Sequence, residues 1–142
     1  MSIVLKKIDH VAVCVPSLDQ ALARYGELFG LKGVDRDHSA ALETEAVLLP
    51  IGESSIELIS PYPTVSSGIL SRFLERRGPG LHHIAIEVEG LDAALALLKA
   101  LGVPLIDETP RIGARGHRIA FISPKATGGV LIELVEPIET AH

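Results

Sequence analysis

Two short stretches of the chain occur twice, and each carries residues able to bind a metal ion. Ile8–Val15 returns as Leu81–Val88, and Ser55–Ile59 returns as Leu131–Val135. The repeats place one histidine and one glutamate in each half of the chain: His10, Glu57, His83 and Glu133. Two imidazoles and two carboxylates around one point would form the shell of a divalent metal, with positions left open for water or substrate.

The repeat extends beyond these four residues. When residues 8–23 are set against residues 81–96, eight of the sixteen positions are identical, where chance would give about one. A lone histidine on a strand is more often structural than a ligand, but here the same residue types recur at equivalent positions. Both glutamates lie inside apolar strands, where a carboxylate is costly unless it is paired or bound to a metal.

The elements that would position these residues follow the order β-α-β-β-β in each half. In the first half the pattern predicts a helix between Ser17 and Gly30, and strands near residues 8–15, 32–36, 43–50 and 54–60. In the second half it predicts a helix over residues 91–101, and strands near 81–89, 103–106, 117–122 and 130–136. Strand alternation places Val11, Val13, Ile84 and Ile86 under the helices, which puts His10 and His83 on the opposite face.

We therefore predict an α+β fold in which two tandem βαβββ modules form a curved mixed sheet shaped as a cup. Residues 1–142 would make a single domain, with module one at about 6–61, a connector at 62–79 and module two at about 80–137. A half of about 70 residues would be marginal alone, so the modules are expected to fold together. The connector carries apolar residues at helical spacing over 68–77.

Composition excludes several classes of protein. A net charge of −5 and the absence of tryptophan argue against a nucleic-acid partner, which needs a basic face and aromatic stacking platforms. No apolar run reaches the roughly 20 residues of a membrane span. The single Cys14 excludes an internal disulfide and fits a reducing compartment, so we expect a cytoplasmic protein with no membrane partner.

The chain resembles the vicinal oxygen chelate (glyoxalase/bleomycin-resistance/dioxygenase) superfamily, and within it the methylmalonyl-CoA epimerase family. The matching stretches lie between about residues 6 and 137, and they are Ile8–Ala12, Phe73–Gly78, Gly80–Ala85, Leu105–Arg111 and Pro124–Leu134. The chain departs from the family in two places. His38–Glu45 replaces the family's Glu-Gln-Gly-Val run, and Ser123 replaces its histidine before Pro-Lys.

This resemblance implies a metal-dependent epimerase that removes and returns the proton alpha to the thioester of methylmalonyl-CoA. His10, Glu57, His83 and Glu133 would ligate the metal. Glu45 would serve as a base outside the shell and Glu133 as the second catalytic carboxylate, because inversion needs one group on each face of the substrate. Glu43, near Glu45, would have no catalytic role. His82 would be structural.

The resemblance also sets the expected cofactor and partners. The cofactor would be a divalent cobalt, nickel, manganese or zinc ion, since His/Glu shells accept each of these. The partners would be a small acyl-CoA substrate and a second copy of the chain in a homodimer. The basic loop Arg111–Arg118, with Lys125, could meet the phosphates of coenzyme A or be a solvated surface loop.

Two other functions share the fold and stay open. A glyoxalase I-type lyase would use the same four ligands on a glutathione hemithioacetal. A metal-free sequestering protein of the bleomycin-resistance type would use the cup only for binding. An extradiol dioxygenase is disfavoured, because such enzymes leave iron three protein ligands and four are available here.

Overall fold

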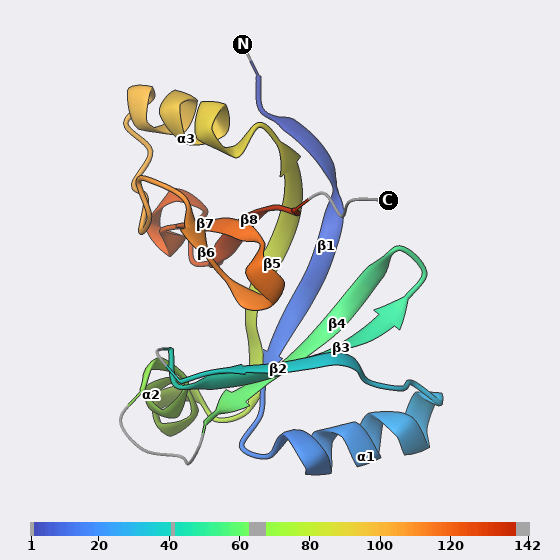
Figure 1. Cartoon of the computed structure of the whole chain (residues 1–142). Coiled ribbons are helices and arrows are strands. Elements are labelled where there is room, and N and C mark those ends of the chain that lie inside the picture. The colour runs from blue at the N-terminus through green and yellow to red at the C-terminus, as the bar shows by residue number, and fades with distance from the viewer. Residues whose placement is uncertain (1, 41, 63–67, 139–142) are drawn as a thin grey trace. The chain divides into compact units, whose positions relative to one another are not determined.

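The computed structural model describes residues 2–40, 42–62 and 68–138 and divides into two compact units (Figure 1). Unit 2 comprises His10–His82, whereas unit 1 combines Met1–Asp9 with His83–His142. Strand β1 (Val4–Cys14) therefore contributes residues to both units. The predicted connector 62–79 lies partly outside the described residues.

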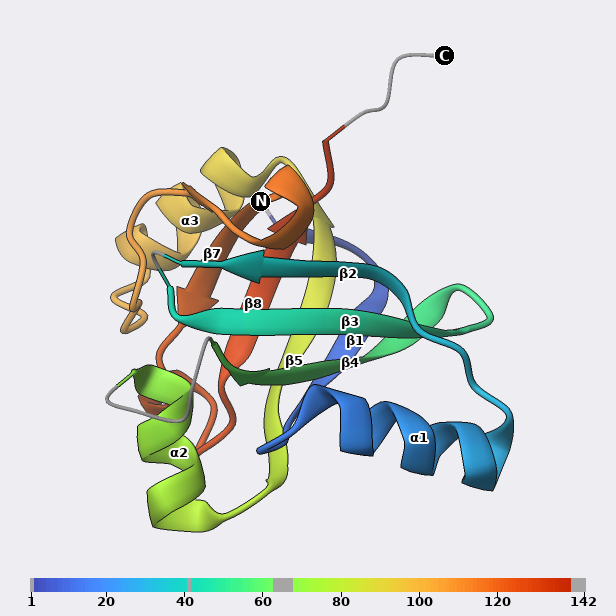
Figure 2. The ribbon, with the colours of Figure 1, turned by 60° about the horizontal axis from the view of Figure 1, so that its bottom comes forward.

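In unit 2 the sheet order is β2-β3-β4-β1, with β1 parallel to β4 and the other pairs antiparallel. The further elements of this unit are α1 (Leu18–Phe29), β2 (Val34–Ser39), β3 (Thr44–Ile51), β4 (Ser54–Pro61) and α2 (Ile69–Arg77). Figure 2 shows β2, β3 and β4 side by side, with α1 next to them. The βαβββ order predicted for the first half is thus present.

Helix α1 begins and ends where the sequence predicts. The Ser17 hydroxyl accepts a hydrogen bond from the backbone N–H of Gln20 at 3.3 Å, which satisfies one of the open donors of the first turn. Gly30 ends the helix in the left-handed region at φ 69°, and its N–H donates to the Gly26 carbonyl. The apolar side of α1 packs on one face of the sheet, in a cluster that includes Val15, Leu18, Val47, Leu49 and Leu58.

Helix α2 packs on the other face of this sheet. Its apolar residues Leu70, Phe73 and Leu74 join a cluster with sheet residues Ala12, Cys14, Ala46 and Ile59. Because side chains alternate along a strand, His10 lies on the same face as Ala12, and Glu57 on the same face as Ile59. The face of unit 2 that carries His10 and Glu57 is therefore the α2 face.

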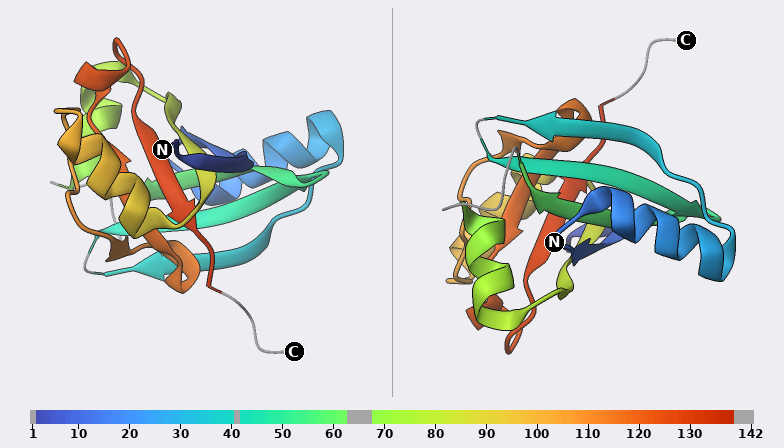
Figure 3. Two further views of the ribbon diagram at one scale, coloured as in Figure 1. Left: turned by 90° about the horizontal axis from the view of Figure 1, so that it is seen from above. Right: turned by 90° about the horizontal axis from the view of Figure 1, so that it is seen from below.

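Unit 1 repeats this order with β5 (Gly80–Glu89), which begins in the last residues of unit 2, and four further elements. These are α3 (Leu91–Ala100), β6 (Arg111–Ile112), β7 (Arg118–Ile122) and β8 (Ile132–Glu136), in the sheet order β1-β5-β8-β7-β6. Helix α3 packs on one sheet face, as the views of Figure 3 also show, in a cluster that includes Val88, Leu91, Leu95, Ala120 and Leu134. The other face carries Ala85, Ile119, Phe121 and Val135.

One predicted strand is wrong. Residues 103–106 make only an isolated bridge, between Leu105 and Ile122, and the strand beside β7 is instead β6. Pro104 lacks an N–H and its carbonyl accepts a hydrogen bond from Ser123, while Val103 bonds back to Leu98 of α3. The segment thus makes isolated backbone hydrogen bonds and does not pair regularly with β7. Among the described residues, no helix is long and apolar enough to cross a membrane.

Candidate metal centre

His10 and Glu57 form a buried pair in unit 2. Each residue is only 5% exposed, and His10 Nε2 lies 3.5 Å from Glu57 Oε1. The pairing of β1 with β4 explains this contact, because it sets Ala12 directly beside Glu57 and His10 two residues earlier on the same face. The surrounding apolar strands give the carboxylate little access to water.

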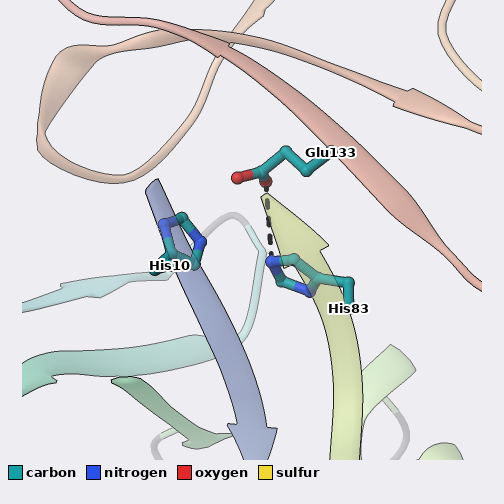
Figure 4. Close-up of side chains that lie close together, drawn as sticks. All are labelled: His10, His83 and Glu133. Carbon is teal, nitrogen blue, oxygen red and sulfur yellow. Dashed lines mark ion pairs between the residues drawn. The ribbon is translucent and has the colours of Figure 1, made fainter. Parts of the chain in front are cut away.

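His83 and Glu133 form the corresponding pair in unit 1. Each is 7% exposed, and His83 Nε2 lies 3.9 Å from Glu133 Oε2, the contact drawn as a dashed line in Figure 4. The parallel pairing of β5 with β8 sets Ala85 beside Glu133, just as β1 and β4 set Ala12 beside Glu57. The two pairs are therefore built by the same register in each unit.

The donor atoms of these residues are of the kinds that bind divalent metal ions. His10, His83 and Glu133 offer two imidazole nitrogens and a carboxylate oxygen, and all three residues are buried. Nitrogen and oxygen donors of this kind suit first-row divalent metals. A bound cation would also offset the cost of holding ionisable side chains away from water, which an isolated buried charge would incur.

Phe121 and Arg111 border the His83–Glu133 pair within unit 1. The Phe121 ring lies edge-on to the His83 imidazole, with centroids 5.3 Å apart and planes at 90°. The Arg111 guanidinium carbon lies 5.5 Å from the centre of the same Phe121 ring. This geometry was not predicted, although the sequence does place basic residues in the loop Arg111–Arg118.

The structure does not bring Glu45 together with His10 and Glu57, in contrast to its expected role as a base beside the metal. Cross-strand pairing sets Leu48 opposite Glu57, so even-numbered residues of β3 share the Glu57 face and Glu45 lies on the α1 face. There Glu45 Oε1 accepts a 2.8 Å hydrogen bond from Arg36 Nε, and Arg36 also binds Asp19 of α1 at 2.7 Å. This ion-pair network joins Glu45 to α1 through Arg36.

Glu43, by contrast, lies near the start of α2. Its carboxylate covers Gly68 so closely that a Cβ added at residue 68 would stand 2.6 Å from Glu43 Oε2. Gly68 is the N-cap of α2, where helical N–H groups favour a negative charge. Glu43 adopts a left-handed backbone at φ 55°, which takes it out of the alternation of β3 and accounts for the failure of sequence reasoning to place it.

Arg118 and His82 are each held by neighbouring side chains. Arg118 binds Asp92 and Glu136, so it is already engaged in ion pairs. His82 lies edge-on to Phe73 of α2, with ring centroids 4.9 Å apart, and burial lowers its pKa. A neutral, packed His82 agrees with a structural residue.

Comparison with known proteins identifies the family. Residues 9–121 match the model of the Glyoxalase/Bleomycin resistance protein/Dioxygenase superfamily, and the chain belongs to that superfamily. Over 138 residues it is 38% identical to the uncharacterized protein YqjC of Bacillus subtilis, covering 97% of both chains. It is 34% identical over 131 residues to the mitochondrial methylmalonyl-CoA epimerase of Dictyostelium discoideum, covering 92% of this chain and 78% of that protein.

A solved structure extends the likeness to the backbone. The crystal structure of methylmalonyl-CoA epimerase from Mycobacterium tuberculosis matches with a TM-score of 0.90 at 36% identity, covering 98% of this chain and 93% of that one. The resemblance and the α+β fold predicted from the sequence are thereby confirmed.

Proposed function

We propose that this protein is a metal-dependent epimerase acting on methylmalonyl-CoA. The observation that carries the proposal is the pair of buried His–Glu contacts, His10–Glu57 and His83–Glu133, built by the same strand register in both units. The likeness to methylmalonyl-CoA epimerases supports the substrate.

The proposed reaction makes two demands on the protein. The proton alpha to a thioester is a poor acid, so its removal needs a positioned base and a group that stabilises the enolate charge. We assign His10, Glu57, His83 and Glu133 as the ligands of one divalent ion. When bound, this ion supplies the positive charge that stabilises the enolate oxygen and orients the substrate.

Inversion of a stereocentre also needs two proton-carrying groups, one on each face of the substrate. We assign Glu133 as one of them, as the resemblance implies. For the other we choose Glu43 instead of Glu45, because Glu43 lies against the start of α2, the helix on the His10–Glu57 face. Glu45 lies on the opposite face and is held by Arg36. Glu43 would take the proton at a carboxylate oxygen while Glu133 returns one, or the reverse.

Deuterium incorporation tests this function. The metal-supplemented protein is incubated with one epimer of methylmalonyl-CoA in deuterated water, and proton NMR follows the α-hydrogen and methyl signals. An epimerase exchanges the α-hydrogen and produces the other epimer. If the substrate stays unexchanged and the protein instead converts a glutathione hemithioacetal, it is a glyoxalase-type lyase. If it binds ligands but converts neither substrate, the sequestering role holds.

Two further proposals concern the setting of the protein. We propose a homodimer, as the epimerase resemblance implies, and sedimentation velocity at micromolar concentration measures the mass directly. We also propose a cytoplasmic location, since the one cysteine is a buried thiol, as suits a reducing compartment. Fractionation of the source cells tests it.

A further inference from the structure

Arg111 and Phe121 form a small platform beside the His83–Glu133 pair. The guanidinium carbon of Arg111 lies 5.5 Å from the Phe121 ring centre, within the range of a cation–π contact. The same ring meets His83 edge-on at 5.3 Å. One phenyl ring thus separates a cation from a candidate metal ligand.

Strand pairing places all of these side chains on one face of the unit 1 sheet. Arg111 of β6 lies opposite Ile119 of β7, and Phe121 of β7 lies opposite Glu133 of β8. Ile119 and Phe121 are two residues apart, so they share a face, and directly paired residues share a face as well. Arg111 therefore points to the side that carries Glu133.

Asp107 holds the guanidinium in this position. Its Oδ2 accepts a 2.8 Å hydrogen bond from the backbone N–H of Phe121 and lies 3.4 Å from Arg111 Nε. The Asp107 side chain is 16% exposed, whereas that of Arg111 is 45% exposed. Because the ion pair uses Nε, the two terminal nitrogens of Arg111 can bind a second oxyanion in the forked geometry typical of arginine.

We infer that Arg111 binds the free carboxylate of the malonyl-type acyl group and so selects dicarboxylic acyl-CoA thioesters over neutral ones. This inference rests on the proposed function. Neighbouring strands lie about 4.8 Å apart. A short acyl group beside Glu133 on β8 can therefore reach the Arg111 guanidinium, which lies over the Phe121 ring on β7. The phosphates of coenzyme A lie a whole pantetheine arm away from the thioester, which favours the carboxylate as the bound oxyanion.

Arg118 supplies a matched control. It belongs to the neighbouring strand β7 but pairs with Asp92 and Glu136, so its charge is already used inside the protein. Strand alternation also places Arg118 on the face opposite to Arg111, since Arg118 shares a face with Ala120, which packs in the α3 cluster. Replacing Arg118 removes the same charge from the other side of the sheet.

Two ligands separate the possible oxyanions in the test. Malonyl-pantetheine carries the carboxylate without the nucleotide, and propionyl-CoA carries the nucleotide without the carboxylate. Isothermal titration of the metal-loaded protein measures both affinities in the parent, Arg111→Gln, Arg111→Lys and Arg118→Gln. We expect Arg111→Gln to weaken malonyl-pantetheine about tenfold or more, the loss of a charge-assisted contact, and propionyl-CoA less than about twofold.

The other two variants distinguish a specific loss of binding from a general loss of folding. Arg111→Lys should recover part of the affinity for malonyl-pantetheine, and Arg118→Gln should leave the preference between the two ligands unchanged. A loss confined to propionyl-CoA would overturn the inference and assign Arg111 to the phosphates, and unchanged affinities would overturn it as well. If the parent binds neither ligand, the inference falls with the proposed substrate. If the parent binds malonyl-pantetheine through Arg111 but exchanges no α-proton, only the epimerase function fails.

Discussion

Arg118 and Glu136 lie directly opposite one another on β7 and β8, and their side chains join through a 2.6 Å contact between Nη1 and Oε1. The other Glu136 oxygen accepts hydrogen bonds from the backbone N–H groups of Gly90 and Leu91, at the start of α3. One carboxylate thus caps a helix and pairs with an arginine. The Leu91 hydrogen bond is the main cause that lowers the pKa of Glu136, with the Arg118 contact adding to it.

This pKa shift predicts a loss of stability in acid. A carboxylate with a lowered folded-state pKa stabilises the protein fully above its unfolded pKa, near 4.5, and the contribution is lost as the pH falls through the folded value. Glu136→Gln should therefore cost about 0.5–1 kcal/mol at pH 7 and flatten the decline below pH 4.5. Urea unfolding between pH 7 and pH 3 measures both. Glu27→Gln, which removes an exposed partner of Arg24, should change neither.

Metal content tests the candidate centre. We expect about one divalent ion per chain in metal-supplemented protein, and His10→Ala or His83→Ala should lose it, because each removes one nitrogen ligand. Chelation should lower the Tm of the parent, since an ion that binds only the folded state stabilises it. Elemental analysis and thermal scans measure the two effects. His82→Ala is the neighbouring control and should keep the ion, and full metal retention in both ligand variants would contradict the centre.

The two glutamates that flank Thr44 should behave differently. Glu43→Gln should lower epimerisation by roughly 10² or more while the fold and metal content persist, as for loss of a general base. Glu45→Gln should keep most of the turnover but lower the Tm, because Arg36 loses a partner on the α1 face. Steady-state kinetics with each epimer compare them. The opposite pattern would restore Glu45 as the base.

Cys14 should be unreactive in the folded protein. Its side chain is fully buried in the α2 cluster, and burial raises the pKa of the thiol to about 11, so almost no thiolate is present at neutral pH. A thiol reagent at pH 7.5 should label the native protein only at the rate of unfolding, and label it rapidly in urea. Rapid labelling without denaturant would show that α2 opens readily.

The sequence correctly predicted the features that follow from the internal repeat and from the alternation of side chains along strands. The repeat identified both His–Glu pairs, and period-two alternation correctly put Val13 and Ile86 under helices, with His10 on the other face. Those inferences need only the geometry of a strand, which local sequence determines. The four metal ligands themselves remain a proposal.

Glu45 was assigned by resemblance to the family, and the structure places it on the α1 face beside Arg36. The pairing of β2 with β3 shifts register between Val34 and Asp37, and both Asp35 and Glu43 have left-handed backbones. The pairing of β3 with β4 is continuous from Thr44 to Ile51, so the left-handed backbone removes Glu43, and not Glu45, from the alternation of β3. The Arg111–Phe121 platform escaped detection for another reason, because it depends on a two-residue strand that a hydrophobic pattern cannot indicate.

The sharing of β1 between the two units also has a consequence for the nascent chain. Residues of β1 are synthesised before the other strands, but Met1–Asp9 belong to the unit whose other members begin at His83. At roughly 5–20 residues per second of synthesis, these first residues wait several seconds before β5 is made, and longer before β8 completes the sheet. Ile3, which packs against the α3 cluster in the folded protein, stays available to chaperones throughout that interval. Unit 1 can therefore complete its fold only after β8 has been synthesised, although its first residues belong to β1.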